Sequence, residues 1–175
     1  LAGADLALAA LALAQFKPAA GRGVRQTLGV AGGDVTLVDE SYNANPASMA
    51  AALNVLGQAE LGPRGRRIAV LGDMLELGVS GPDLHRGLVQ AITANNIDRV
   101  FCCGPLMRYL WEALPSAKKG GYADTSAALE SDVLSAIGAG DAVTVKGSLG
   151  SRMKLIVTAL EKRFPSKASL DDLAV

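Results

Sequence analysis

The sequence predicts an α/β domain of Rossmann-like, three-layer type, with a mostly parallel sheet and an N-terminal β-hairpin. From Val24 onward, short β-branched runs alternate with longer helical segments, as in repeated β-α units. The runs at 68–72, 99–104 and 141–147 are almost continuously apolar, which is typical of parallel strands buried on both faces. Half of the 175 residues are apolar and 19% are charged, as expected for a chain that folds around a core.

The individual elements follow in order along the chain. RQTLGV and DVTLVDE flank the turn sequence AGG and are typical of a hairpin, and a weaker short strand is predicted at 121–123. Asn45 as N-cap and Pro46 as first residue predict a helix over PASMAAALNVLG, and Ser80 and Pro82 repeat that arrangement before DLHRGLVQAITA. Apolar stripes at helical spacing predict the last two helices: Leu129, Val133 and Ile137 in one, and Met153, Ile156, Val157, Leu160 and Phe164 in the other.

The ends of the chain suggest a domain boundary. Residues 1–16 form helix-favouring sequence that is apolar on nearly every face, so we expect the last helix of a preceding central domain. The alternative is a terminal helix that packs on its own domain. Pro and Gly residues make 17–24 a hinge, 25–164 is the Rossmann-like domain, and 165–175 is expected to be a loosely held, flexible tail.

Composition excludes several classes of function. Seventeen basic residues balance seventeen acidic ones, so nucleic acid is not an expected partner. The two cysteines, Cys102 and Cys103, are adjacent, a spacing that suits neither a disulfide framework nor a zinc site. The longest apolar run covers residues 6–14, well short of the about 20 residues that span a bilayer, and no basic segment of a secretory signal precedes it. We expect a cytoplasmic protein without membrane insertion.

Polar, glycine-rich loops follow the apolar strands. They are DESYNANP (39–46), LGDMLELG (71–78), CGPLM (103–107) and VKGSLGSRM (145–153). Ligands of open parallel sheets bind beyond the carboxyl ends of the strands. A binding site is therefore expected where these loops meet.

The first loop carries side chains suited to a nucleotide. Asp39, Tyr42, Asn43 and Asn45 supply a carboxylate, a phenol and two amides that could hydrogen-bond a base or ribose. The alternative is local: Asn45 is a preferred N-cap residue, and Asn43 is a common turn residue.

The second and fourth loops carry charges. Asp73 and Glu76 could receive an ammonium group, although Asp73 also suits an ordinary turn. Gly147 permits close backbone approach, and Lys146 with Ser148 could hold an oxyanion at a helix start. The alternative is that the lysine reaches a carboxylate on a neighbouring strand and that the serine caps the helix.

Several motifs are missing. Neither G-x-x-x-x-G-K-[ST] nor G-x-G-x-x-G occurs, so the chain lacks the usual phosphate-binding loops. The single histidine, His85, has apolar neighbours on a predicted helix and is expected to pack rather than react. No zinc signature or common catalytic triad can be assembled, and no metal ligands are assigned.

Taken together, FKPAAGRG, DESYNANPASMAAALNVL, VLGDMLELG and VKGSLGSRM resemble the C-terminal domain of Mur ligases, most closely those that add D-alanyl-D-alanine to UDP-N-acetylmuramoyl-tripeptide. The resemblance implies an ATP-dependent ligase of peptidoglycan synthesis that works through an acyl phosphate. It also implies an N-terminal domain that binds the UDP-sugar and a central domain that carries the phosphate loop and the Mg²⁺ ligands, so that this fragment alone is inactive.

The resemblance also implies roles for single residues. Arg22 resembles an interdomain arginine that reaches the ATP phosphates, a task suited to a guanidinium group, and Lys146 joins it in catalysis. The expected nucleotide-binding residues are Arg22, Asp39, Tyr42, Asn43 and Asn45. The expected dipeptide-binding residues are Gly72, Asp73, Met74, Glu76 and Ser148.

Two positions depart from the family pattern: Glu40 stands where an Asp is common, and Leu149 where an Arg often follows the VKGS turn. The sister ligase for diaminopimelate carries Asp-Asn-Pro-Arg where CGPLM stands here, which favours the dipeptide-adding type. The alternatives are a non-catalytic nucleotide-binding or regulatory α/β domain, and a sister ligase of the Mur or folylpolyglutamate type.

Overall fold

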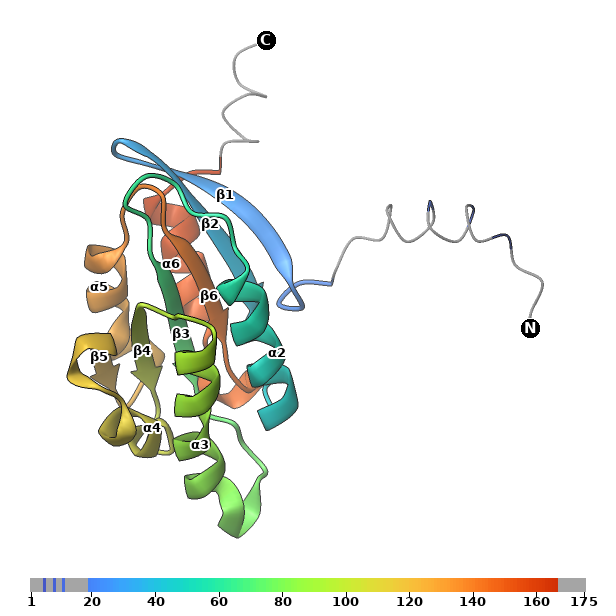
Figure 1. Cartoon of the computed structure of the whole chain (residues 1–175), viewed down its shortest axis with the longest axis vertical. Coiled ribbons are helices and arrows are strands. Elements are labelled where there is room, and N and C mark those ends of the chain that lie inside the picture. The colour runs from blue at the N-terminus through green and yellow to red at the C-terminus, as the bar shows by residue number, and fades with distance from the viewer. Residues whose placement is uncertain (1–4, 6–7, 9–10, 12–18, 167–175) are drawn as a thin grey trace.

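The computed structural model describes residues 5, 8, 11 and 19–166 (Figure 1). The predicted helix over 1–16 and the first residues of the predicted hinge therefore lie almost entirely outside the described residues, as does the tail from residue 167. Within the described part of the chain, no helix is long and apolar enough to cross a bilayer.

One six-stranded sheet forms the centre of the domain, in the order β1-β2-β6-β3-β4-β5. Strand β1 pairs antiparallel with β2, and all other neighbours are parallel, which confirms the predicted hairpin and parallel sheet. The weak strand expected at 121–123 is longer and begins at Lys119. The strands are β1 (Val24–Val30), β2 (Gly33–Glu40), β3 (Arg67–Gly72), β4 (Arg99–Cys103), β5 (Lys119–Ala123) and β6 (Ala142–Lys146).

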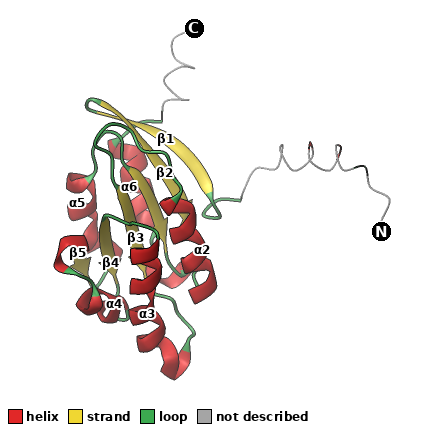
Figure 2. Ribbon diagram, in the orientation of Figure 1, coloured by secondary structure: helices red, strands yellow, loops and turns green. Residues whose placement is uncertain are grey.

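Helices cover both faces of the sheet, giving the three predicted layers (Figure 2). In β3, Ala69 and Leu71 pack with helices α2, α3 and α4, whereas Ile68 and Val70 pack with α5 and α6. Because each face has its own core, the strand is apolar at successive positions rather than alternate ones. The helices are α2 (Pro46–Gly57), α3 (Gly81–Ala94), α4 (Met107–Ala113), α5 (Ser126–Ala136) and α6 (Lys154–Arg163).

The two predicted N-caps behave differently. The Asn45 side chain accepts a hydrogen bond from the Ser48 N–H, and the Ser48 hydroxyl accepts one from the Asn45 N–H, so a complete capping box starts α2. The prediction for Ser80 is wrong, because its side chain caps nothing. A 3-10 turn over Gly78–Ser80 runs directly into α3, which leaves that serine in helical conformation.

The chain just after α6 is tied to the hairpin. Gly29 N–H donates to the Pro165 carbonyl at 2.9 Å, and Ser166 forms an antiparallel bridge with Leu28. The prediction of a loose tail is thus wrong for its first two residues, because their backbone pairs with strand β1.

Candidate functional site

The loops that predict a binding site lie along one edge of the sheet. Glu40 lies beside Lys146 in the β2–β6 ladder, and Gly72 lies beside Cys103 in the β3–β4 ladder. The parallel strands therefore end side by side, and the loops that follow them gather along the carboxyl edge of the sheet (Figure 1).

A pocket of about 230 Å³ lies at this edge beside the start of the hairpin, and we call it the Arg22 pocket. Arg22 lies over the Tyr42 ring, with 4.2 Å between the guanidinium carbon and the ring centroid. Gly21 has φ +73°, and a Cβ there would lie 3.0 Å from the tyrosine backbone nitrogen, so this approach requires glycine. The pocket is lined by Gly21, Arg22, Glu40, Tyr42, Asn43, Asn45, Ser48 and Lys146.

Lys146 is the buried charge of this pocket, with 2% of its surface exposed. Its Nζ donates to Glu40 Oε2 at 3.2 Å and to the Asn43 carbonyl at 2.9 Å. The lysine thus reaches a neighbouring strand carboxylate, as the structural alternative expected, and also lines the pocket proposed from the sequence. Two of its three N–H donors are used in these contacts, so one can serve a ligand.

The two asparagines of the first loop are used locally through their oxygens. Asn45 Oδ1 caps α2, and Asn43 Oδ1 accepts from the Ala44 N–H at 2.8 Å. Among the described residues, neither NH₂ group has an acceptor, and both side chains line the Arg22 pocket. Capping and ligand binding are therefore compatible at these positions, because they use different atoms of the amide.

Asp39 does not join the pocket, contrary to the expectation from the sequence. Successive strand residues point to opposite faces, so Glu40 faces Lys146 while Asp39 faces α6. The Asp39 carboxylate accepts from the Ser41 N–H and hydroxyl and from Lys154 Nζ, at 3.0, 2.6 and 2.9 Å. Burial alone would raise the pKa of this carboxyl, but these bonds outweigh burial and lower it.

The Asp39 carboxyl should make the free energy of unfolding fall as the pH falls. Because the pKa of its carboxyl in the folded state lies below the ordinary value of 3.8, the unfolded state takes up more protons as the pH falls. Its contribution to the free energy of unfolding is complete above that value and is lost as the pH falls through the folded pKa. In thermal unfolding at about pH 7 and pH 3, Asp39→Asn should lower Tm at neutral pH and reduce the further loss in acid. Exposed Asp83→Asn is the control, and an unchanged acid dependence in Asp39→Asn would contradict the assignment.

Asp73 anchors a helix instead of standing free for an ammonium group. Its Oδ1 accepts from the Met107 N–H at 2.8 Å and its Oδ2 from the Leu106 N–H at 3.3 Å, at the start of α4. Burial raises the pKa of the carboxyl, although these bonds act in the opposite direction. Both oxygens are therefore used by the distant start of α4, a role that neither the ammonium site nor the local turn expected from the sequence describes.

The other residues of the second loop divide between core and surface. Met74 is fully buried, and its N–H donates to His85 Nε2 at 2.9 Å, while His85 Nδ1 lies 2.6 Å from the Gly81 carbonyl. These contacts require the neutral ring with its proton on Nδ1 and confirm a packing role for the histidine. They also place the Met74 side chain in the core, contrary to its assignment to substrate. Glu76 is exposed and has a left-handed backbone, with φ 64°.

Ser148 joins three loops and does not cap a helix. Its hydroxyl accepts from the Leu75 N–H at 2.9 Å and contacts the Ala44 carbonyl at 3.4 Å, and its N–H donates to the Asp73 carbonyl. Gly72 lies against the same turn, because a Cβ there would be 2.6 Å from Met153 Cγ. Both residues therefore shape the edge of the sheet, and neither presents a free polar group to the surface.

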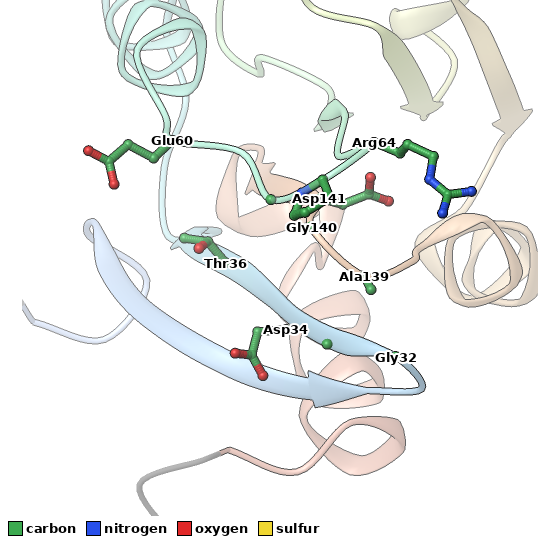
Figure 3. A pocket seen from close by; sticks show the side chains of 11 residues that line it. Gly32, Asp34, Thr36, Glu60, Arg64, Ala139, Gly140 and Asp141 are labelled. Carbon is green, nitrogen blue, oxygen red and sulfur yellow. The ribbon is translucent and has the colours of Figure 1, made fainter.

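Two further cavities, one at each edge of the sheet, are larger than the Arg22 pocket. One, of about 550 Å³, lies at the carboxyl edge and is lined by residues that include Arg152, Asp124 and Thr125. Three of the polar loops that predict a binding site, 71–78, 103–107 and 145–153, contribute to its lining, but Arg152, Asp124 and Thr125 were not among the predicted site residues. The other, of about 630 Å³, lies at the opposite edge, where β2 and β6 begin, with the carboxylates of Asp34 and Glu60 on its walls (Figure 3).

The described residues contain no group of three metal-ligating side chains, and the cysteines are ordinary core residues. Burial raises the pKa of both thiols, that of Cys103 to about 11 and that of Cys102 further. Thiolate chemistry at neutral pH is therefore disfavoured at both positions.

A known protein family matches the part of the chain that forms this edge of the sheet. The family described as "Mur ligase, glutamate ligase domain" matches residues 25–149. The chain belongs to the Mur ligase family. That match contains the carboxyl ends of the parallel strands and most of the Arg22 pocket, although Arg22 itself lies just before it.

Two relatives of similar identity share one name. The UDP-N-acetylmuramoyl-tripeptide–D-alanyl-D-alanine ligase of Bacillus subtilis is 33% identical over 131 residues, which are 72% of this chain and 28% of the relative. The Escherichia coli ligase of the same name is 34% identical over 136 residues, 72% and 27% of the two chains. The chain thus spans less than a third of the length of these Mur ligases.

Solved structures of such ligases have a similar fold. The MurF ligase of Thermotoga maritima in complex with ADP superposes with a TM-score of 0.71 at 25% identity, covering 87% of this chain and 33% of that one. The corresponding Acinetobacter baumannii ligase gives a TM-score of 0.72 at 25% identity, with 91% and 33% covered. Both likenesses confirm the predicted fold class.

Proposed function

We propose that the chain is the C-terminal domain of an ATP-dependent ligase that joins D-alanyl-D-alanine to UDP-N-acetylmuramoyl-tripeptide in peptidoglycan synthesis. The observation that carries the proposal is the Arg22 pocket. It gathers a guanidinium group, an ammonium group and two free amide NH₂ groups at the carboxyl edge of a parallel sheet. In a chain whose relatives bear the name of this ligase, such a donor-rich pocket suits a nucleotide.

The donor set fits ATP in part. Arg22 and Lys146 supply positive charge for phosphate oxygens, and the Tyr42 ring with the two asparagine amides suits a base or ribose. The pocket volume of about 230 Å³ is below the range of roughly 300–1,000 Å³ common for small-molecule sites. We therefore assign the remaining walls of the nucleotide site, and the Mg²⁺ ligands, to a central domain outside these residues.

In the proposed mechanism, bound ATP would supply the γ-phosphoryl group that turns the tripeptide carboxylate into an acyl phosphate, leaving ADP, and attack by the dipeptide amine would release that group as inorganic phosphate. Arg22 and Lys146 hold negative charge at the phosphates, where fixed donors stabilise the transition state without reorganisation. The short loops along the sheet edge hold the dipeptide so that its amine can attack the activated carboxyl group. Docking of this edge on the central domain excludes water from the activated substrate.

Domain limits and location belong to the same proposal. We place the hinge at 17–24 and the Rossmann-like domain at 25–164, with residues 1–16 as the last helix of the central domain. A cytoplasmic location follows from the need for ATP and a nucleotide-linked substrate.

The test is ligation by the complete encoded polypeptide. With ATP, D-alanyl-D-alanine and UDP-N-acetylmuramoyl-tripeptide, mass spectrometry should detect the joined product together with released phosphate, and residues 1–175 alone should give none. The gene should also encode a G-x-x-G-K-[ST] loop ahead of Leu1. Failure of the complete polypeptide to form the product would reject the function, and turnover by residues 1–175 alone would reject the proposed division of the site.

A further inference from the structure

The cavity of about 550 Å³ at the carboxyl edge has the size of a small-ligand site. Its walls come from the loops after β3 and β4, the start of α5 and the turn after β6. It is separate from the Arg22 pocket, with which it shares no lining residue.

Both carboxylates on the cavity wall are already engaged. Asp73 holds the start of α4, and Asp124 accepts from the Tyr122 hydroxyl at 2.7 Å and lies 3.7 Å from Arg108. Arg152 is different: its guanidinium makes no hydrogen bond or ion pair within the described part of the chain. It is therefore the cavity-lining charge that is free to bind a ligand.

The backbone that carries this guanidinium is fixed. Arg152 has a left-handed conformation, with φ 52° and ψ 36°. Its N–H donates to the Leu149 carbonyl at 3.1 Å, and its carbonyl accepts from the Leu155 N–H at 3.0 Å. The turn thus holds the Cα at the cavity wall while the side chain remains free.

The remaining walls near this arginine are apolar and small. Leu75 and Leu155 line the cavity and are 40% and 46% exposed, large fractions for leucines in a folded domain. Gly150 packs closely beneath the first of them, since a Cβ there would lie 2.7 Å from Leu75 Cδ1. The cavity therefore combines one free cation with apolar surface suited to methyl groups.

We propose that Arg152 binds the C-terminal carboxylate of the incoming dipeptide and so selects an acceptor with a free carboxylate. The dipeptide methyl groups lie against Leu75 and Leu155, and its amine remains at the cavity mouth. A bidentate guanidinium–carboxylate pair provides the geometric selectivity. This inference rests on the proposed ligase function and assigns a residue of its acceptor site.

The test is an amide-resolved NMR titration of the chain with D-alanyl-D-alanine and with its C-terminal amide, which lacks the negative charge. The acid should shift amides around the cavity and bind at least about tenfold more tightly than the amide, as expected for a lost charged hydrogen bond. Arg152→Gln should lose that preference, and Arg152→Lys should restore part of it. Arg163→Gln, at the exposed far end of α6, is the matched control and should keep the preference.

Two results would overturn the assignment. One is an unchanged preference in Arg152→Gln, and the other is the absence of cavity shifts in the unaltered chain. The ligation assay on the complete polypeptide separates this failure from failure of the function. If the complete polypeptide forms product normally, and Arg152→Gln changes neither the ligation rate nor the preference for the acid in the titration, the ligase function stands and the arginine does not bind the acceptor.

Discussion

Gly65→Ala is expected to lower the free energy of unfolding by more than about 3 kcal/mol, because it forces apart two backbone segments that cross in contact. A Cβ at Gly65 would lie 1.9 Å from the Gly140 carbonyl oxygen and 2.5 Å from its carbon. The crossing is also hydrogen-bonded, since the Gly62 N–H donates to that same oxygen at 3.0 Å. Backbone cannot move aside as a flexible side chain can, so the clash must displace the loop before β3 or the loop before β6.

The matched control is Gly87→Ala in the middle of α3, where a Cβ would meet nothing within 4 Å. Alanine is favoured over glycine inside a helix by about 0.5–1 kcal/mol, so this variant should be slightly more stable. Urea unfolding of both variants measures the difference. Equal stability of the Gly65 variant and the unaltered chain would show that the two loops do not cross as described.

Lys146→Met is expected to reduce ligation by the complete polypeptide at least about 100-fold, because it removes a fixed positive charge from the Arg22 pocket. It should also cost about 1–3 kcal/mol of stability, since the Asn43 carbonyl and the Glu40 carboxylate lose their common donor. Steady-state kinetics and urea unfolding measure the two effects. Lys162→Met, on the exposed last turn of α6, should change neither.

A double variant separates function from stability. Glu40→Leu with Lys146→Met replaces both members of the ion pair and should recover stability, because no charge is left without its partner. Turnover should remain low. Recovery of turnover together with stability would mean that the lysine only supports the fold.

The architecture could be predicted because its causes are local. Continuous apolar runs such as 68–72 require a sheet covered on both faces, and the Asn45-Pro46 start of α2 follows from capping alone. The failure at Ser80 shows the limit of this reasoning, since a preceding 3-10 turn supplies the backbone start that a cap would otherwise provide.

The site was only partly predictable. Arg22, Tyr42, Asn43, Asn45 and Lys146 do meet at one pocket, because parallel strands end at a common edge. Which way a side chain points depends on strand register, which turns Asp39 toward α6. What a carboxylate binds depends on distant elements, as with the start of α4 at Asp73. Neither fact is visible in the loop sequences themselves.

Arg22→Ala in the complete polypeptide is the most direct test of the central claim that this sheet edge forms one half of a nucleotide site. Arg25→Ala is the matched control, because it removes an exposed arginine three positions along, on β1, outside the Arg22 pocket. The ATP-dependent ligation rate should fall at least about 100-fold in the first variant and remain unchanged in the second. Equal rates in the two variants would contradict the claim.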